Sequence, residues 1–123
     1  MKSHSKVAII GGGIMGVSLL YHLTKEGWSD IVLIEKGELT SGSTWHAAGQ
    51  CPHFVGSYNS AKIHNYSNKL YQELEKETGQ STGWHGCGSI RLALKKEDVN
   101  WFHYVKGILD NVGSPAEIIS KEE

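Results

Sequence analysis

The chain has little of what marks three large classes of protein. It holds only two cysteines, Cys51 and Cys87, and no CxxC spacing, so nothing indicates a redox or zinc motif. Lysine and arginine number 12 against 13 acidic residues, and without a basic excess we expect no nucleic-acid partner. No apolar run approaches the roughly 18 residues of a membrane span, so we expect no membrane partner.

Metal ligands and targeting signals are also scarce. His85 and Cys87 are potential ligands, but no further ligand stands at a suitable spacing, and we expect no metal site. The residues before the first predicted strand, which starts at Val7, are too few for a signal or transit peptide. The two cysteines could pair, although a cytosolic nucleotide-binding fold usually keeps them reduced. The predicted location is cytoplasmic.

What the sequence does contain is the order strand, glycine turn, helix and strand, between Val7 and Glu35. Residues 7–10 are continuously apolar, as in a parallel strand covered on both faces. The stretch from about 14 to 25 predicts a helix that packs on the sheet, with Gly27 at its end. Residues 31–35 predict the second strand. This order predicts an α/β fold with a Rossmann-like βαβ unit.

Three glycines, Gly11, Gly13 and Gly16, occupy the positions of the dinucleotide fingerprint. The first allows the tight turn, the second lets the backbone approach a pyrophosphate, and the third lets the helix pack close to the strand. The pyrophosphate would bind the N–H groups at the start of the helix near Ile14. The alternative is a plain structural turn, because glycine-rich turns join many strands to helices.

Glu35 lies nineteen residues after Gly16, at the end of the second predicted strand. A carboxylate at this place can accept hydrogen bonds from the ribose hydroxyls of an adenosine. Taken alone, an acid at the end of a strand is more often only solvated. The position within the βαβ unit is what makes Glu35 a candidate.

The segment from Leu39 to Gly49 is rich in small and hydroxyl residues and holds one Trp–His pair, Trp45 and His46. Because it follows Glu35, we expect it near the bound nucleotide, where small residues let the backbone approach a ligand. The alternative is an ordinary surface loop with His46 in solvent. From the spacing alone, that alternative is favoured.

The remainder of the chain predicts two helices and two strands. The helices cover residues 59–78, closed by Gly79, and residues 97–111. Alternating apolar residues predict a half-buried strand over 89–94, and residues 116–119 predict a short one.

Two features predict that these 123 residues belong to a longer protein. Ser120 and Glu123 have the spacing of a capping box, which begins a helix, yet no helix follows. Two parallel strands and one helix also do not complete a doubly wound sheet, which needs several strands with helices on both faces. We therefore expect residues 1–123 to be the N-terminal part of a domain that is truncated at its C-terminus.

With these motifs in place, the chain resembles the N-terminal part of the dimethylglycine and sarcosine dehydrogenases, FAD-dependent oxidoreductases of the D-amino-acid-oxidase-like superfamily. The stretch 7–13 with Glu35 and Lys36 is common to the whole superfamily. The stretch 39–49 is specific, as are the segments within 70–93. The Gly-Ser-Ile-Arg form at 88–91 is closer to the dimethylglycine dehydrogenases.

The resemblance implies FAD as the cofactor. In the family, the histidine that matches His46 is bonded covalently to the 8α-methyl carbon of FAD, so the same link is implied here. No catalytic residue is assigned, because the groups that would contact the substrate lie mostly beyond Glu123. The implied cofactor-binding residues are Gly11, Gly13, Ile14, Met15, Gly16, Glu35, Lys36, Ser43, Thr44 and His46.

The resemblance also implies oxidation of a small N-methyl amine, such as dimethylglycine or sarcosine, by hydride transfer to the flavin. Tetrahydrofolate and an electron-transfer flavoprotein are implied partners of domains that this chain lacks, and the 123 residues alone are expected to be inactive. One alternative is a non-catalytic paralogue that resembles the regulatory subunit of pyruvate dehydrogenase phosphatase. His46 favours the enzyme, because that subunit is not expected to keep the histidine. A bare FAD-binding module is a third possibility.

Overall fold

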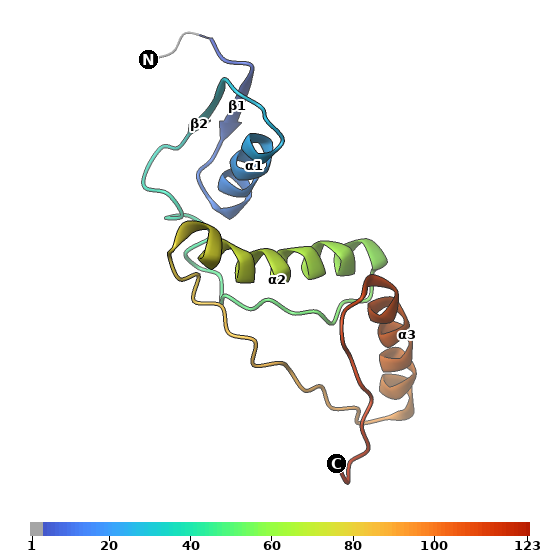
Figure 1. Ribbon diagram of the computed structural model, residues 1–123. Helices are drawn as coiled ribbons and strands as arrows, with labels where there is room; N and C mark the ends of the chain where they lie inside the picture. The colour runs from blue at the N-terminus through green and yellow to red at the C-terminus, as the bar shows by residue number, and fades with distance from the viewer. Residues whose placement is uncertain (1–3) are drawn as a thin grey trace. The chain divides into compact units, whose positions relative to one another are not determined.

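A computed structural model describes residues 4–123, and the chain divides into two compact units. The first unit runs to Gln50 and the second from Cys51 to Glu123. Both strands and the first helix lie in the first unit, and two longer helices lie in the second (Figure 1).

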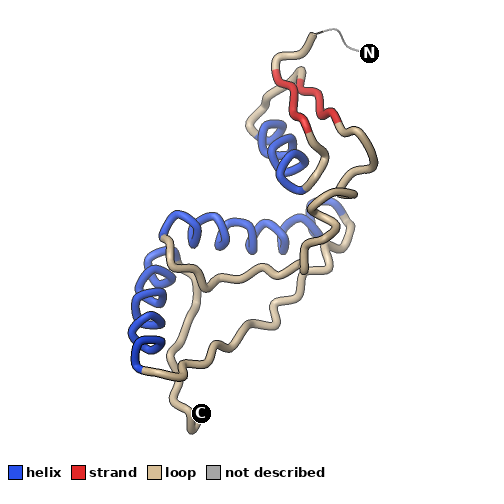
Figure 2. The backbone as a smooth tube through the Cα atoms, turned by 180° about the vertical axis from the view of Figure 1, so that it is seen from behind, coloured by secondary structure: helices blue, strands red, loops and turns tan. Residues whose placement is uncertain are grey.

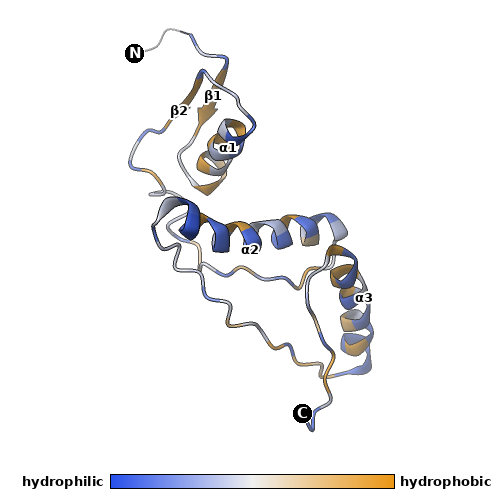
Figure 3. Ribbon diagram, in the orientation of Figure 1, coloured by the Kyte–Doolittle hydropathy of each residue, from blue (hydrophilic) through white to orange (hydrophobic). Residues whose placement is uncertain are grey.

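The first unit is a parallel βαβ unit. Strand β1 (Val7–Ile10), helix α1 (Ile14–Lys25) and strand β2 (Ile31–Ile34) follow one another along the chain. The two strands pair in parallel, from Val7 opposite Ile31 to Ile10 opposite Ile34. Both strands are hydrophobic along their length (Figure 3), as expected in a parallel sheet. The predicted α/β fold with a Rossmann-like βαβ unit is confirmed.

Helix α1 ends where the sequence predicts. Gly27 follows the capping residue Glu26 and has a left-handed φ of +80°. The N–H groups of Gly27 and Trp28 donate to the carbonyls of Thr24 and Leu23, each at 3.0 Å. This pair of bonds is the Schellman motif, which satisfies carbonyls that the helix itself cannot. The turn it makes leads the chain directly into β2.

The second unit is built on helices α2 (Tyr58–Thr78) and α3 (Lys96–Val112). Each helix ends at a glycine with a left-handed φ, Gly79 after α2 and Gly113 after α3. The fully buried core is small and consists of Ala61 from α2 with Val105 and Leu109 from α3. Partly buried side chains that pack against it are Phe54, Val55, Ile108, Val112 and Ala116.

Buried polar groups also hold the second unit together. Asn68 and Ser114 are only 2% and 3% exposed. The amide nitrogen of Asn68 donates to Nε2 of His53 at 2.9 Å, so in the neutral ring Nδ1 carries the proton. Nδ1 donates that proton to Oγ of Ser114 at 2.6 Å. His53 thereby links α2 to the residue that follows Gly113.

Two predicted strands are wrong. Residues 89–94 and 116–119 lie in loops (Figure 2). A strand needs a hydrogen-bonded neighbour, and no segment within residues 4–123 pairs with either of them. Ile90 and Leu94 are accordingly 82% and 88% exposed. The capping-box spacing gives only a local turn, in which the Ser120 N–H donates to a carboxylate oxygen of Glu123 at 3.0 Å.

Candidate cofactor-binding site

The turn between β1 and α1 needs glycine at two of its fingerprint positions. Gly11 has a φ of +105°, a left-handed conformation that disfavours other residues, and its N–H donates to the Ile34 carbonyl at 2.8 Å. A Cβ on Gly16 would collide with the carbonyl oxygen of Gly11. The first glycine therefore makes the turn, and the third lets α1 pack against it, as the fingerprint predicts.

Glu35 closes this turn from the other strand. Its Oε2 accepts the Gly12 N–H at 2.6 Å, and its Oε1 accepts the Gly37 N–H at 3.0 Å. These bonds, with smaller contributions from the backbone and charge of Lys36, hold the pKa of the Glu35 carboxyl below its ordinary value of 4.5. Glu35 is therefore ionised at neutral pH, and each oxygen keeps acceptor capacity for a further donor such as a ribose hydroxyl.

The start of α1 offers backbone donors. The N-cap residue, Gly13, has no side chain to cap the helix, and the first turn carries no acidic residue. The Ile14 N–H donates to Oγ1 of Thr44 at 2.9 Å. The N–H groups of Met15 and Gly16 have no acceptor within the helix, because they belong to its first turn. Together with the helix dipole, they make a place that favours an anionic group.

The segment after Glu35 folds back onto the glycine turn. The Thr40 N–H donates to the Gly12 carbonyl at 3.0 Å, and Thr40 has a left-handed φ of +67°. Successive turns then carry the chain to His46, whose imidazole is exposed. Nδ1 of His46 lies 2.9 Å from the carbonyl oxygen of Gly42. A carbonyl can only accept, so Nδ1 carries the proton and Nε2 keeps its lone pair.

The structure brings most of the predicted residues to one end of the sheet. The glycine turn, the start of α1, Glu35 and Thr44 are joined by the hydrogen bonds above. Met15 has an 82% exposed side chain, and its N–H group belongs to the first turn of α1. Ser43 and His46 are tied to their own turn, where the His46 N–H donates to the Ser43 carbonyl at 3.2 Å.

Sequence reasoning missed three contributors: Gly12, Gly37 and Thr40. Gly12 and Gly37 donate to Glu35, and Thr40 donates to Gly12. The position of Gly12 also has no room for a larger residue, since a Cβ there would collide with the side chains of Leu39 and Glu35. The run of three glycines was a signal for Gly12. No local pattern indicates the left-handed conformation of Thr40, because it is a rare state for a β-branched residue.

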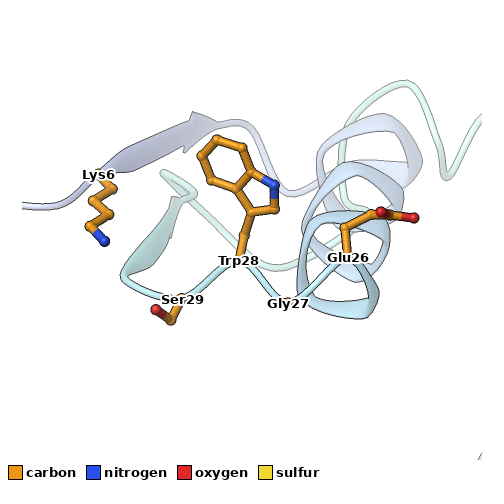
Figure 4. Close-up of a pocket in the computed structure, with 5 residues that line it drawn as sticks. All are labelled: Lys6, Glu26, Gly27, Trp28 and Ser29. Atoms are coloured by element: carbon orange, nitrogen blue, oxygen red, sulfur yellow. The ribbon is translucent and has the colours of Figure 1, made fainter.

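A shallow hollow at the opposite end of the strands is not part of this site (Figure 4). It is lined by residues just before β1 and β2, including Lys6, Trp28 and Ser29. Lys6 and Glu26 lie on opposite sides of Trp28 in the close-up. Ligands of parallel α/β sheets bind outside the carboxyl ends of the strands, and this hollow lies at the amino ends.

Comparison with known proteins agrees with this geometry. A family model for FAD-dependent oxidoreductases matches residues 6–123. The chain belongs to this family. Among the residues that the structure describes, no helix has the length and apolar character needed to cross a membrane. Residues 4–123 also bring no three histidine, cysteine or acidic side chains together as metal ligands.

Relatives within the family include two named as mitochondrial proteins. Dimethylglycine dehydrogenase from Rattus norvegicus is 56% identical over 103 residues, which are 84% of this chain and 12% of that protein. The pyruvate dehydrogenase phosphatase regulatory subunit from Mus musculus is 46% identical over 123 residues, which are 100% of this chain and 14% of that protein. The chain therefore spans only a small part of the length of either relative.

A solved structure has the same fold. The L-amino acid deaminase from Proteus vulgaris superposes with a TM-score of 0.80 at 23% sequence identity. The match covers 99% of this chain and 30% of the deaminase. At this identity the likeness bears on the fold alone, and it agrees with the parallel arrangement of β1 and β2 described above.

Proposed function

We propose that this chain is the N-terminal, FAD-binding part of an amine dehydrogenase of the dimethylglycine and sarcosine type. The observation that carries the proposal is the hydrogen-bonded assembly of Glu35, the glycine turn and Thr44 around the start of α1. It occurs in a chain that is 56% identical to a dimethylglycine dehydrogenase. The amine oxidation itself belongs to the whole protein, and residues 1–123 alone are expected to be inactive.

The residues present fit an adenine dinucleotide. Gly16 has no room for a Cβ, and the N–H groups of Met15 and Gly16, which have no acceptor within the helix, suit a pyrophosphate. Glu35 is an ionised acceptor that suits the ribose hydroxyls, with Lys36 beside it. In this proposal Gly11, Gly13 and Ile14–Gly16 hold the pyrophosphate. Ser43, Thr44 and His46 extend the site toward the flavin. When bound, FAD supplies the acceptor for a hydride from the N-methyl carbon of the amine.

The covalent link is assigned to Nε2 of His46. The bond from Nδ1 to the Gly42 carbonyl supports this choice, because it fixes the tautomer in which Nε2 holds the lone pair. The neutral imidazole is the nucleophilic form of the ring, because one of its nitrogens then has a free lone pair. The exposure of His46 leaves Nε2 accessible to a bound cofactor.

The test is a denaturing gel of the full-length protein viewed under ultraviolet light. A fluorescent band in the wild type that is lost in His46→Ala supports the link. FAD that is present in the native protein but released by acid precipitation would remove the covalent bond from the proposal and leave FAD binding intact. A protein that retains no FAD in either form would contradict the proposal as a whole.

A second candidate is a non-catalytic regulatory protein. The 46% identity to the phosphatase regulatory subunit, which extends over all 123 residues, favours it. The two candidates differ in whether His46 carries FAD covalently. Covalently bound flavin would therefore support the dehydrogenase. Flavin reduction on adding dimethylglycine or sarcosine under anaerobic conditions would settle the matter in favour of the enzyme and would rank the two amines.

The remaining partners are proposals of the same origin. Tetrahydrofolate and an electron-transfer flavoprotein would act through parts of the protein outside this chain.

The predicted cytoplasmic location stays a prediction, and the word mitochondrial in the names of the two relatives makes a mitochondrial location the competing one. Fractionation of cells that express the full-length protein would decide between the two compartments.

A further inference from the structure

Helix α1 is capped by a residue that lies far along the chain. Its own N-cap residue is Gly13, which has no side chain, so the usual local cap is missing. Oγ1 of Thr44 takes that role by accepting the Ile14 N–H at 2.9 Å. Thirty residues separate the two partners, and Thr44 is one of the few partly buried residues of its loop.

The approach of Thr44 to the glycine turn is close. A Cβ on Gly13 would lie 3.0 Å from Oγ1 of Thr44, which is tighter than ordinary contact. A second bond joins the same two segments, since the Thr40 N–H donates to the Gly12 carbonyl at 3.0 Å. The loop is therefore fixed at two points, Gly12 and Ile14, which lie among the residues that would hold the pyrophosphate.

The same loop orients His46. The Ala47 N–H donates to the Thr44 carbonyl at 3.2 Å, and the His46 N–H donates to the Ser43 carbonyl at the same distance. The imidazole is held in turn by the Gly42 carbonyl. Thr44 thus lies inside the turn that carries the imidazole. Within the described part of the chain, its hydroxyl makes the only side-chain hydrogen bond from residues 40–47 to the start of α1.

We propose that Thr44 is a positioning residue for the attachment of FAD to His46. This inference rests on the proposed covalent link. The Thr44 hydroxyl does not act on the reacting atoms. It fixes the distance between the pyrophosphate site at α1 and the imidazole, so that a cofactor bound at the first presents its 8α carbon to the second. Positioning of this kind controls the rate of bond formation more than the affinity for the cofactor.

The attachment balances as an oxidation. One C–H bond of the 8α-methyl group and the N–H bond of the imidazole are broken, and one C–N bond forms at Nε2. The two protons and two electrons released pass to dioxygen, which becomes hydrogen peroxide. Thr44 takes no part in these transfers, and its contribution is geometric.

The experiment measures covalent incorporation of FAD into the full-length apo-protein in air. Samples are quenched in acid at intervals, and in-gel flavin fluorescence gives a rate constant at each FAD concentration. Thr44→Val removes the acceptor and keeps the shape. Thr44→Ser restores the acceptor. Thr24→Val is the matched control, because the Thr24 hydroxyl also bonds the backbone of α1, where it donates to the Tyr21 carbonyl at 2.7 Å, but it lies at the far end of the helix.

We expect Thr44→Val to lower the limiting rate constant about tenfold or more, with the FAD concentration at half-saturation changed by less than about threefold. Thr44→Ser and Thr24→Val should match the wild type. A variant that changes only the FAD concentration at half-saturation, and not the limiting rate constant, would make Thr44 a direct cofactor ligand and overturn the inference. So would failure of Thr44→Ser to restore the rate.

Two further outcomes separate this inference from the function on which it rests. Attachment at the wild-type rate in Thr44→Val would overturn the positioning role and leave the covalent link standing. A wild-type protein that binds FAD without ever forming the bond would overturn both. Circular dichroism and thermal melting of the apo-proteins show whether a slow variant is folded, and Thr44→Ser keeps the test open if Thr44→Val is not.

Discussion

Backbone groups make the important contacts in the first unit of the chain, and side chains make them in the second. In the first, the important contacts run between backbone groups, as at Gly12, or between backbone and one side chain, as at Glu35 and Thr44. In the second, buried side chains such as Leu109 and Asn68 make the contacts. The first unit therefore depends on positions that have no side chain, and the second on positions where side chains pack.

The largest effect should come from emptying the core of the second unit. Leu109 is 2% exposed, so Leu109→Ala should lower the free energy of unfolding by about 2–5 kcal/mol, since it removes apolar contacts and leaves a cavity. Urea denaturation of the chain measures the change. Leu92→Ala is the matched control, because Leu92 is 79% exposed and the same substitution should have little effect. Equal effects at the two positions would show that burial of Leu109 does not stabilise the second unit.

In the first unit, adding a single methyl group should be the most harmful change. Gly16→Ala places a Cβ on the Gly11 carbonyl oxygen and forces α1 away from the turn. We expect FAD affinity to fall about a hundredfold, or roughly 2.7 kcal/mol, measured by titration of flavin fluorescence. Gly107→Ala, in α3, has open space around the new methyl group and should leave FAD affinity unchanged. Unaltered binding in Gly16→Ala would remove the glycine turn from the site.

These expectations show how much the sequence could predict. The glycines and the apolar strands are local signals, and they predicted the turn and the βαβ unit that the structure contains. The spacing of Glu35 predicted an acceptor for a ribose, which stays a prediction, and it did not indicate the bond from the Gly12 N–H. The bond between Thr44 and Ile14 spans thirty residues, so no local pattern indicates it. The prediction of a strand over residues 89–94 was wrong for the same reason. Alternating apolar residues indicate two faces of a segment, but a strand also needs a hydrogen-bonded neighbouring strand, which the periodicity of one segment does not indicate.

Loss of the Glu35 carboxylate should have a smaller effect than Gly16→Ala. Glu35→Ala should weaken FAD binding about tenfold, because a hydrogen bond to a charged acceptor is lost while the glycines that form the turn are unchanged. Glu38→Ala is the matched control, since Glu38 is an exposed acid in the same unit. Equal affinity in Glu35→Ala and wild type would show that Glu35 serves only the fold.

The same carboxylate gives the first unit a pH dependence. The folded-state pKa of Glu35 is depressed, so its contribution to stability is present above the ordinary value of 4.5 and is lost as the pH falls through the folded-state pKa. The difference in unfolding free energy between wild type and Glu35→Gln should therefore shrink as the pH falls from neutral through the folded-state pKa of Glu35. A difference that stays constant over this range would mean that Glu35 titrates alike in the folded and unfolded chain.

The smallest effect belongs to an exposed ion pair of the second unit. Lys106 Nζ lies 2.8 Å from both carboxylate oxygens of Asp110, one helical turn further along α3. Pairs of this kind contribute about 0.3–0.5 kcal/mol, so a double-mutant cycle with Lys106→Ala and Asp110→Ala should give a coupling of that size. A coupling as large as the effect of Leu109→Ala would mean that surface charge, and not the core, stabilises this unit.

The backbone character of the first unit has a consequence for mutational tolerance. Ile14 and Met15 contribute their N–H groups, while their side chains are 48% and 82% exposed. Almost any residue other than proline supplies the same N–H group. In a saturation library selected for FAD retention, both positions should therefore accept very different side chains, whereas Gly16 should accept none. A few positions of the site therefore restrict substitution strongly, and most of their neighbours tolerate it.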